Sequence, residues 1–257
     1  MSGIDYSHVT EAHGNEISRE ALEMMCTRYV FAARFSERRD VLEVACGAGQ
    51  GLGVLGGHAR RVVGADYTAA LLDMARGHYA GRVPLARIDA QLLPFAGGSF
   101  DVVVMYEALY YLANPRAFIA EARRVLRPGG RLIVCTVNRE WGDFNPSPFS
   151  TSYHSATELR ALLEHGGFQT AMFAAFPVQQ ASLRDRVVSI VKRTAVTLGL
   201  VPKTMRGKRL LKRLFFGQLV VFPPELREDM APYHAPVPLT GVGQVSGYKV
   251  LYAVGAV

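Results

Sequence analysis

Three acidic side chains at the ends of apolar stretches predict a binding site for a polar ligand. Glu43, Asp66 and Asp89 each stand at or near the end of such a stretch. A carboxylate at the second position can accept both hydroxyls of a ribose, and one at the third can accept from the exocyclic amine of adenine. Glu43 favours a ligand that carries positive charge or many donor groups.

Glycines follow the first of these acids. Gly47 and Gly49 stand between a predicted strand, 41–45, and a predicted helix, 50–58. Glycine adopts torsions and allows close approaches that a Cβ would forbid. A ligand can therefore rest against this turn and the N-terminus of the helix. A pyrophosphate would need bare N–H groups with no acid beside them, so Glu43 argues against a dinucleotide.

Elements that alternate along the chain position these residues. Apolar stretches typical of strands alternate with amphipathic stretches typical of helices, which indicates an α/β fold with a parallel sheet. The predicted strands are 41–45, 61–66, 83–88, 102–105, 131–137, 168–176 and 248–254, and the predicted helices are 16–35, 50–58, 68–79, 114–126 and 157–166.

The order of these motifs resembles that of the class I S-adenosylmethionine-dependent methyltransferases. The nearest branch is the small-molecule enzymes related to ubiquinone and menaquinone methyltransferases. The resemblance covers roughly residues 25–176 and the last strand, and it departs from the family at Ala45, where glycine is usual. The residues that carry it are Glu43-x-x-x-Gly47-x-Gly49, Asp66, Asp89-Ala90-Gln91-x-Leu93-Pro94-Phe95 and Arg127-Pro128-Gly129-Gly130.

This resemblance implies S-adenosylmethionine as the cofactor and a Rossmann-like fold. The implied sheet has seven strands in the order 3-2-1-4-5-7-6, with strand 7 antiparallel and a helical insertion between strands 6 and 7. The implied division is an N-terminal lid helix, 1–35, a core, 36–176 and 247–257, and a basic insertion, 177–246. The expected cofactor-binding residues are Arg28, Glu43, Ala45, Gly47, Gly49, Asp66, Tyr67, Asp89, Ala90 and Tyr106.

Two other kinds of protein compete with this interpretation. Gly51-x-Gly53-x-x-Gly56 has the spacing of the fingerprint of an NAD-dependent dehydrogenase, but it lies inside the predicted helix instead of directly after the strand. A non-catalytic partner protein that only binds the cofactor is the second alternative.

Methyl transfer to a hydroxyl or an amine needs a group that takes up a proton. The acceptor site of such a fold lies past the fourth and fifth strands. Glu107 and His154 are the candidate bases, because both follow these strands and histidine titrates near neutral pH. The predicted pocket residues are His8, His13, Tyr110, Tyr111 and Tyr153. No carboxylate cluster indicates a metal, so we expect metal-independent transfer to a small molecule.

The excess of positive charge comes from one segment. The net charge is +7, yet residues 181–217 alone hold ten Lys or Arg and one acid, which gives +9 and leaves −2 for the remainder. Basic residues at four-residue spacing predict an amphipathic helix. The segment 183–216 can be a cap over the pocket or a peripheral contact with anionic lipid, which would suit C-methylation or O-methylation of a quinone or lipid-linked substrate. Nucleic-acid binding is the least favoured alternative, because no aromatic stacking motif accompanies the charge.

Composition fits one globular domain in a reducing compartment. The chain has 257 residues, of which 49% are hydrophobic, enough for a sizeable core. Cys26, Cys46 and Cys135 are scattered and predict buried free thiols. Neither a signal peptide nor an apolar run of membrane-spanning length is visible. We therefore expect a cytoplasmic protein, with possible peripheral contact with a membrane.

Overall fold

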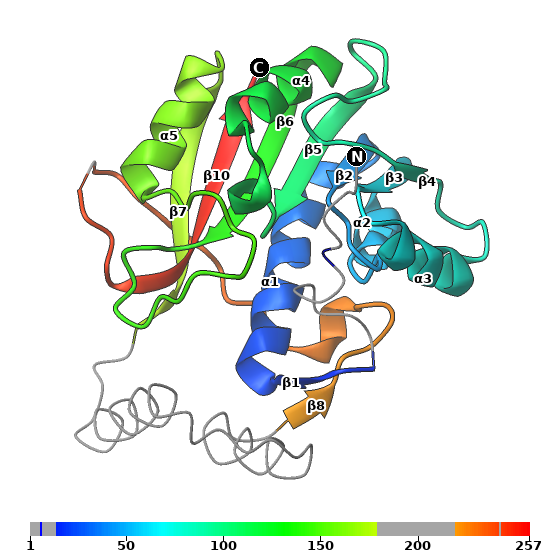
Figure 1. Ribbon diagram of the computed structural model, residues 1–257, viewed down its shortest axis with the longest axis horizontal. Coiled ribbons are helices and arrows are strands. Elements are labelled where there is room, and N and C mark those ends of the chain that lie inside the picture. Colours follow the sequence, from blue (N-terminus) through cyan, green and yellow to red (C-terminus); the bar gives the residue numbers. More distant parts are fainter. Residues whose placement is uncertain (1–5, 7–13, 179–218, 242) are drawn as a thin grey trace.

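The computed structural model describes residues 6, 14–178, 219–241 and 243–257 (Figure 1). The predicted amphipathic helix within 183–216 lies outside the described residues, as do His8 and His13. The expected lipid contact and the role of the basic segment therefore stay predictions. Within the described ranges, no helix is both long and apolar enough to cross a membrane.

A central sheet of eight strands has the order β4-β3-β2-β5-β6-β10-β7-β9. Its strands are β2 (Asp40–Val44), β3 (Arg61–Asp66), β4 (Leu85–Arg87), β5 (Phe100–Tyr106), β6 (Leu126–Val137), β7 (Gln169–Pro177), β9 (Val237–Pro238) and β10 (Tyr248–Ala256). The pairs among β2 to β6 are parallel, whereas β10 is antiparallel to both β6 and β7. This confirms the predicted order and the antiparallel last strand, and β9 extends the sheet beyond the prediction.

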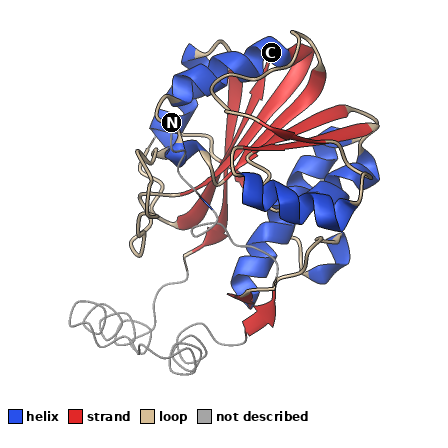
Figure 2. Cartoon of the chain, turned by 45° about the vertical axis from the view of Figure 1, so that its right-hand side comes forward, coloured by secondary structure: helices blue, strands red, loops and turns tan. Residues whose placement is uncertain are grey.

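Helices cover both faces of this sheet (Figure 2). The helices are α1 (Arg19–Ser36), α2 (Leu52–His58), α3 (Ala69–Tyr79), α4 (Pro115–Val125) and α5 (Ala156–His165), with short 3₁₀ turns η2 (Leu109–Tyr111) and η3 (Glu228–Met230). Side chains of α1, α2 and α3 share one core with Val102 and Val104 of β5. Side chains of α4 and α5 share the second core with Val103 and Met105. The alternation along β5 follows from the two-residue period of a strand buried on both faces.

The first helix begins three residues later than the sequence predicts. Residues Glu16–Ser18 form a short strand, β1, which pairs antiparallel with β8 (Leu219–Val221). The Ser18 hydroxyl then accepts a hydrogen bond from the N–H of Ala21 and caps α1. The prediction of a helix from residue 16 was wrong because it could not include a pairing partner about two hundred residues away.

The segment 219–231, which we call the strap, packs along α1 and α2 (orange in Figure 1). Phe222 and Leu226 of the strap are buried in the core that contains α1, α2 and α3. Residues 219–241, which belong to the predicted insertion, contain β8, η3 and β9 and lie against the core.

Candidate functional site

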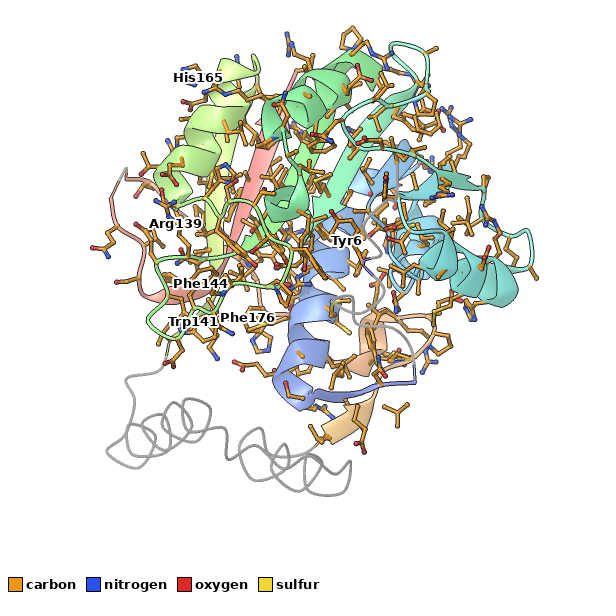
Figure 3. All side chains as sticks on the ribbon, viewed as in Figure 1. Tyr6, Arg139, Trp141, Phe144, His165 and Phe176 are labelled. Atoms are coloured by element: carbon orange, nitrogen blue, oxygen red, sulfur yellow. The ribbon has the colours of Figure 1, made fainter. Side chains whose placement is uncertain are left out.

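A cavity of about 620 Å³ opens at the carboxyl ends of the parallel strands. Its volume lies in the range of small-molecule sites, which is roughly 300–1,000 Å³. Its wall is built from the ends of β2, β3 and β5, from α1, and from the loop after β6. Tyr6 and Trp141, which are far apart in the sequence, both contribute to it (Figure 3). This is the edge at which open α/β sheets bind ligands.

The turn after β2 bends through the left-handed region of backbone torsions. Ala45, Gly47 and Gly49 have φ angles of 60°, 58° and 82°. A Cβ on Gly49 would lie 3.0 Å from the Tyr79 ring, so this glycine allows a close approach as well as a torsion. Ala45 and Gly47 line the cavity, whereas Gly49 supports the turn from behind. Ala45 holds a torsion that costs an alanine about 1–2 kcal/mol.

Packing accounts for the two glycines that mimic a dinucleotide fingerprint. A Cβ on Gly51 would lie 1.9 Å from the ring of Tyr29, and a Cβ on Gly53 would lie 2.0 Å from the carboxylate of Glu225. A side chain from another segment therefore packs against each of these glycines, in the space that a Cβ would need. Their spacing follows from these contacts and gives no support to a dehydrogenase.

Asp66 ends β3 and points into the cavity from a buried position. Its Oδ2 accepts from the N–H of Gly47 and its Oδ1 from the N–H of Thr68, each at 2.8 Å. Burial raises the pKa of Asp66, and these backbone hydrogen bonds oppose the shift. Each carboxylate oxygen keeps a further lone pair, so Asp66 can still accept from a ligand hydroxyl.

The adenine end predicted from the sequence lies beside Asp66. Tyr67, Asp89 and Ala90 line the same part of the cavity wall as Gln91. Tyr67 is 39% exposed, and the Asp89 Oδ1 accepts from the N–H of Gln91 at 2.8 Å. These side chains therefore suit a nucleoside: two carboxylates that accept from its hydroxyls and amine, and an aromatic ring that packs on its base.

Glu43 lies beneath the cavity and does not contribute to its wall. The side chain is 1% exposed, and the Tyr29 hydroxyl donates to its Oε1 at 2.7 Å. Burial raises the pKa of Glu43 to about 8, the hydrogen bond from Tyr29 lowers it, and the charge of Asp66 raises it. Its Oε2 has no hydrogen-bond partner among the described residues. At neutral pH much of this buried carboxyl is therefore protonated.

Arg28 of α1 and Glu107 at the end of β5 meet across the cavity wall. The Arg28 guanidinium pairs with the Glu107 Oε1 at 3.0 Å, and the Glu107 Oε2 accepts from the N–H of Val137 at 3.2 Å. The Tyr106 hydroxyl donates to the carbonyl of Arg28 at 2.8 Å, which fastens α1 to β5. Glu107 has a φ of 51°, the kind of outlier that is common at functional sites. Arg28, Tyr106 and Glu107 all line the cavity.

Aromatic rings form the other end of the cavity. Tyr110 and Tyr111 line it as predicted, and the Tyr111 hydroxyl is 2.6 Å from the Ser147 Oγ. The ring of Tyr6 lies 5.1 Å from that of Tyr111 and 6.5 Å from that of Phe149. This end can therefore hold a flat, partly apolar molecule against polar groups at its edge.

Two further predicted residues, besides Glu43 and Gly49, do not reach the cavity wall. Tyr153 stacks on Tyr110 at 4.3 Å and its hydroxyl accepts from the N–H of Ser147 at 2.9 Å, so it supports the wall from behind. His154 is half-buried away from the wall, and burial lowers its pKa. Of the two predicted bases, Glu107 is the one that the structure brings to the cavity.

Sequence reasoning missed several residues of the wall. Lys249 and Val250 line the cavity because β10 runs antiparallel, so its beginning lies at the edge where the other strands end. Trp141 could have been found, since it lies in the loop after the fifth strand, on the ligand side of such a sheet. Tyr6 carries no sequence signal that separates it from its neighbours.

Cys26, Cys46 and Cys135 are buried free thiols, as predicted. In the part of the chain that the structure describes, no three His, Cys, Asp or Glu side chains gather as metal ligands do. Metal independence stays a prediction.

Comparisons with known proteins agree with this geometry. Residues 42–134 match the family model described as a methyltransferase domain. A probable S-adenosylmethionine-dependent methyltransferase of Mycolicibacterium smegmatis is 40% identical over 137 residues, which cover 51% of this chain and 52% of that protein. An O-methyltransferase of Aspergillus sclerotiorum is 27% identical over 207 residues, covering 75% and 76%.

Solved structures share the fold. A structure from Thermotoga maritima, described as an S-adenosylmethionine-dependent methyltransferase and possible histamine N-methyltransferase, superposes with a TM-score of 0.56 at 16% identity, covering 92% of this chain and 93% of that one. The chain spans about half the length of the Mycolicibacterium relative. Residues 42–134 are thus similar to a methyltransferase domain, and the sheet order and the acids at its edge agree with that similarity.

Proposed function

We propose that this protein transfers a methyl group from S-adenosylmethionine to a hydroxyl of a small molecule. One observation carries the proposal: a single cavity joins Asp66 and Asp89 at one end to Glu107 and an aromatic wall at the other. The first end suits a nucleoside, and the second suits an acceptor whose hydroxyl must lose a proton. The likeness to an O-methyltransferase over three-quarters of the chain supports a hydroxyl over an amine.

The residues at the cofactor end have complementary roles. Asp66 would accept from the ribose hydroxyls, Asp89 from the adenine amine, and the Tyr67 ring would pack on the base. The absence of a Cβ on Gly47 lets the cofactor approach the backbone of the turn. When bound, S-adenosylmethionine supplies an electrophilic methyl group on a sulfonium centre.

Glu107 is the group that would accept the acceptor's proton. The acceptor oxygen would take the methyl group that the cofactor supplies, and the methyl–sulfur bond would break to leave a neutral thioether. The hydroxyl proton would pass to the Glu107 carboxylate and later to solvent. Arg28 and the N–H of Val137 fix the orientation of that carboxylate. A positioned base contributes about 10²–10⁴-fold to such a step. The enclosing rings of Tyr110 and Tyr111 limit the water around it.

The test is a turnover assay with the full chain. The protein is incubated with S-adenosylmethionine and a panel of phenols, aliphatic alcohols and amines, and the release of S-adenosylhomocysteine is measured. We expect release with at least one hydroxylated compound and a product whose mass rises by one methylene unit. Release with amines alone would show that the methyl acceptor is an amine and not a hydroxyl. Reduction or oxidation of the panel with NAD would overturn the proposal.

A further inference from the structure

The strap lies outside the cavity wall. It is bound directly to the turn between β2 and α2, which we call the cofactor turn. The N–H of Leu226 donates to the carbonyl of Gln50 at 2.7 Å, and Gln50 is a buried residue that lines the cavity. Leu226 itself is 1% exposed. One hydrogen bond therefore links the backbone of the strap to the backbone of the turn that receives the cofactor.

A tyrosine of α3 fastens both ends of the same turn. The Tyr79 hydroxyl donates to the carbonyl of Gly49 at 2.7 Å and accepts from the N–H of Gly53 at 3.0 Å. Tyr79 is fully buried, and burial raises its pKa. The hydroxyl therefore keeps its proton and can both donate and accept a hydrogen bond. The turn thus keeps its shape through a side chain that never touches the cavity.

Glu225 of the strap connects these two supports. Its carboxylate accepts from the Nε2 of His78 at 2.6 Å and from Arg82 at 3.2 Å, and it lies where a Cβ on Gly53 would stand. The rings of His78 and Tyr79 meet edge to face at 4.8 Å, and the Arg82 guanidinium lies 5.0 Å from the centre of the Tyr79 ring. Glu225 therefore binds His78 and Arg82, whose side chains both contact the ring of Tyr79.

We propose that Tyr79, together with Glu225 and Leu226 of the strap, is a positioning device that holds the cofactor turn in its binding shape. The inference rests on the proposed function, because it assumes that this turn receives S-adenosylmethionine. The strap acts through Gln50, Gly53 and Tyr79 and makes no contact with the cavity of its own. Cofactor affinity then depends on a segment that follows the basic region of the chain.

Linkage gives the first test, which needs no mutation. If the strap stabilises the binding shape of the turn, bound cofactor must stabilise the strap in return. Hydrogen exchange of the full chain, with and without S-adenosylhomocysteine, should show slower exchange for the Leu226 amide and its neighbours in 222–228. Unchanged exchange of the strap in protein that is saturated with S-adenosylhomocysteine would overturn the inference.

Variants give the second test, by titration calorimetry with S-adenosylhomocysteine. Tyr79→Phe keeps the ring but removes the hydroxyl that donates to the Gly49 carbonyl and accepts from the N–H of Gly53. The dissociation constant should therefore rise roughly tenfold. Glu225→Gln should weaken binding by roughly threefold and reduce the exchange effect. Glu228→Gln is the matched control: its residue lies on the same strap, is half exposed and pairs with His58.

The outcomes separate this inference from the proposed function. If the unmodified protein binds no S-adenosylhomocysteine, both fail. If it binds, while Tyr79→Phe and Glu225→Gln bind as tightly as Glu228→Gln, only the positioning role fails. A fall in thermal stability for Tyr79→Phe with an unchanged dissociation constant would likewise assign it a purely structural role.

Discussion

The hydroxyl of Tyr29 lies 2.7 Å from Glu43 and joins α1 to the first strand of the parallel sheet. The same ring covers Gly51, so one tyrosine contacts both Glu43 and the glycine that precedes α2. The lid helix expected from the sequence is thus fastened at the base of the cavity as well as at its wall, where Tyr106 binds the carbonyl of Arg28.

Burial of Glu43 predicts a loss of stability as the pH rises. Its pKa in the folded protein is about 8, against 4.5 for the unperturbed group, so the folded state holds more protons than the unfolded state between these values. The contribution of this group is then most favourable below about pH 4.5 and falls as the pH approaches 8. Glu43→Gln should remove a penalty on the order of a few kcal/mol at pH 8 and change little at pH 5.

Urea unfolding at the two pH values measures this effect. The difference in unfolding free energy between Glu43→Gln and the unmodified protein should become more positive from pH 5 to pH 8. Glu164→Gln, at an exposed position of α5, is the control for loss of a carboxylate. Equal differences at both pH values would show that Glu43 is ionised in the folded state throughout.

The two predicted bases give different expectations for turnover. Glu107 lines the cavity and His154 does not, so Glu107→Gln should lower kcat by about 10²–10⁴-fold, while His154→Gln should leave it within a few-fold. Binding of S-adenosylhomocysteine should change little in either variant. Single-turnover rates with an accepted substrate provide the measurement. A large loss for His154→Gln alone would return the role of base to the histidine.

The strained torsion at Ala45 predicts a stabilising substitution. Ala45→Gly relieves a left-handed torsion at the cost of a more flexible unfolded chain, so we expect the free energy of unfolding to rise by about 0.5–1 kcal/mol. Ala48→Gly is the matched control, because Ala48 is buried and does not share the positive φ, and this change should destabilise. Thermal or urea unfolding of both variants measures the two effects. Destabilisation by Ala45→Gly would contradict the claim that the torsion at Ala45 is strained.

The aromatic end of the cavity predicts a specific effect on the acceptor. Tyr111→Leu removes a ring that contacts Tyr6 and Tyr110, so KM for the acceptor should rise about tenfold, while the affinity for S-adenosylhomocysteine stays constant. Phe144→Leu is the control, since Phe144 packs behind the wall on Tyr153. Steady-state kinetics at saturating cofactor give the comparison. Equal effects of the two substitutions would remove Tyr111 from the acceptor site.

The sequence allowed the sheet order to be predicted, because its motifs are local and follow strand ends in a fixed order. Asp66, Asp89 and Gly47 all line the cavity as expected. Contacts between distant segments escaped prediction. Residues Glu16–Ser18 became a strand through a partner at 219–221, and Lys249 reached the cavity only because its strand is antiparallel.

The position of each side chain relative to the cavity wall explains the remaining differences between the sequence prediction and the structure. Glu43 has the position of a ligand-binding acid in the sequence, yet the structure buries it under the turn, bound to Tyr29. Tyr153 and His154 follow the right strand, but the loop between β6 and α5 turns them away from the wall. A linear pattern specifies which edge of the sheet a residue lies near, and tertiary packing decides whether its side chain reaches the ligand.

Titration calorimetry with S-adenosylhomocysteine tests the cofactor site most directly. The unmodified chain should bind one equivalent, and Asp66→Asn should bind at least tenfold more weakly, because a hydrogen bond to a charged acceptor contributes about 1.5–3 kcal/mol. Asp73→Asn, at an exposed position of α3, should bind like the unmodified protein. Equal affinity of the Asp66→Asn variant, or binding of NAD with no binding of S-adenosylhomocysteine, would contradict the account.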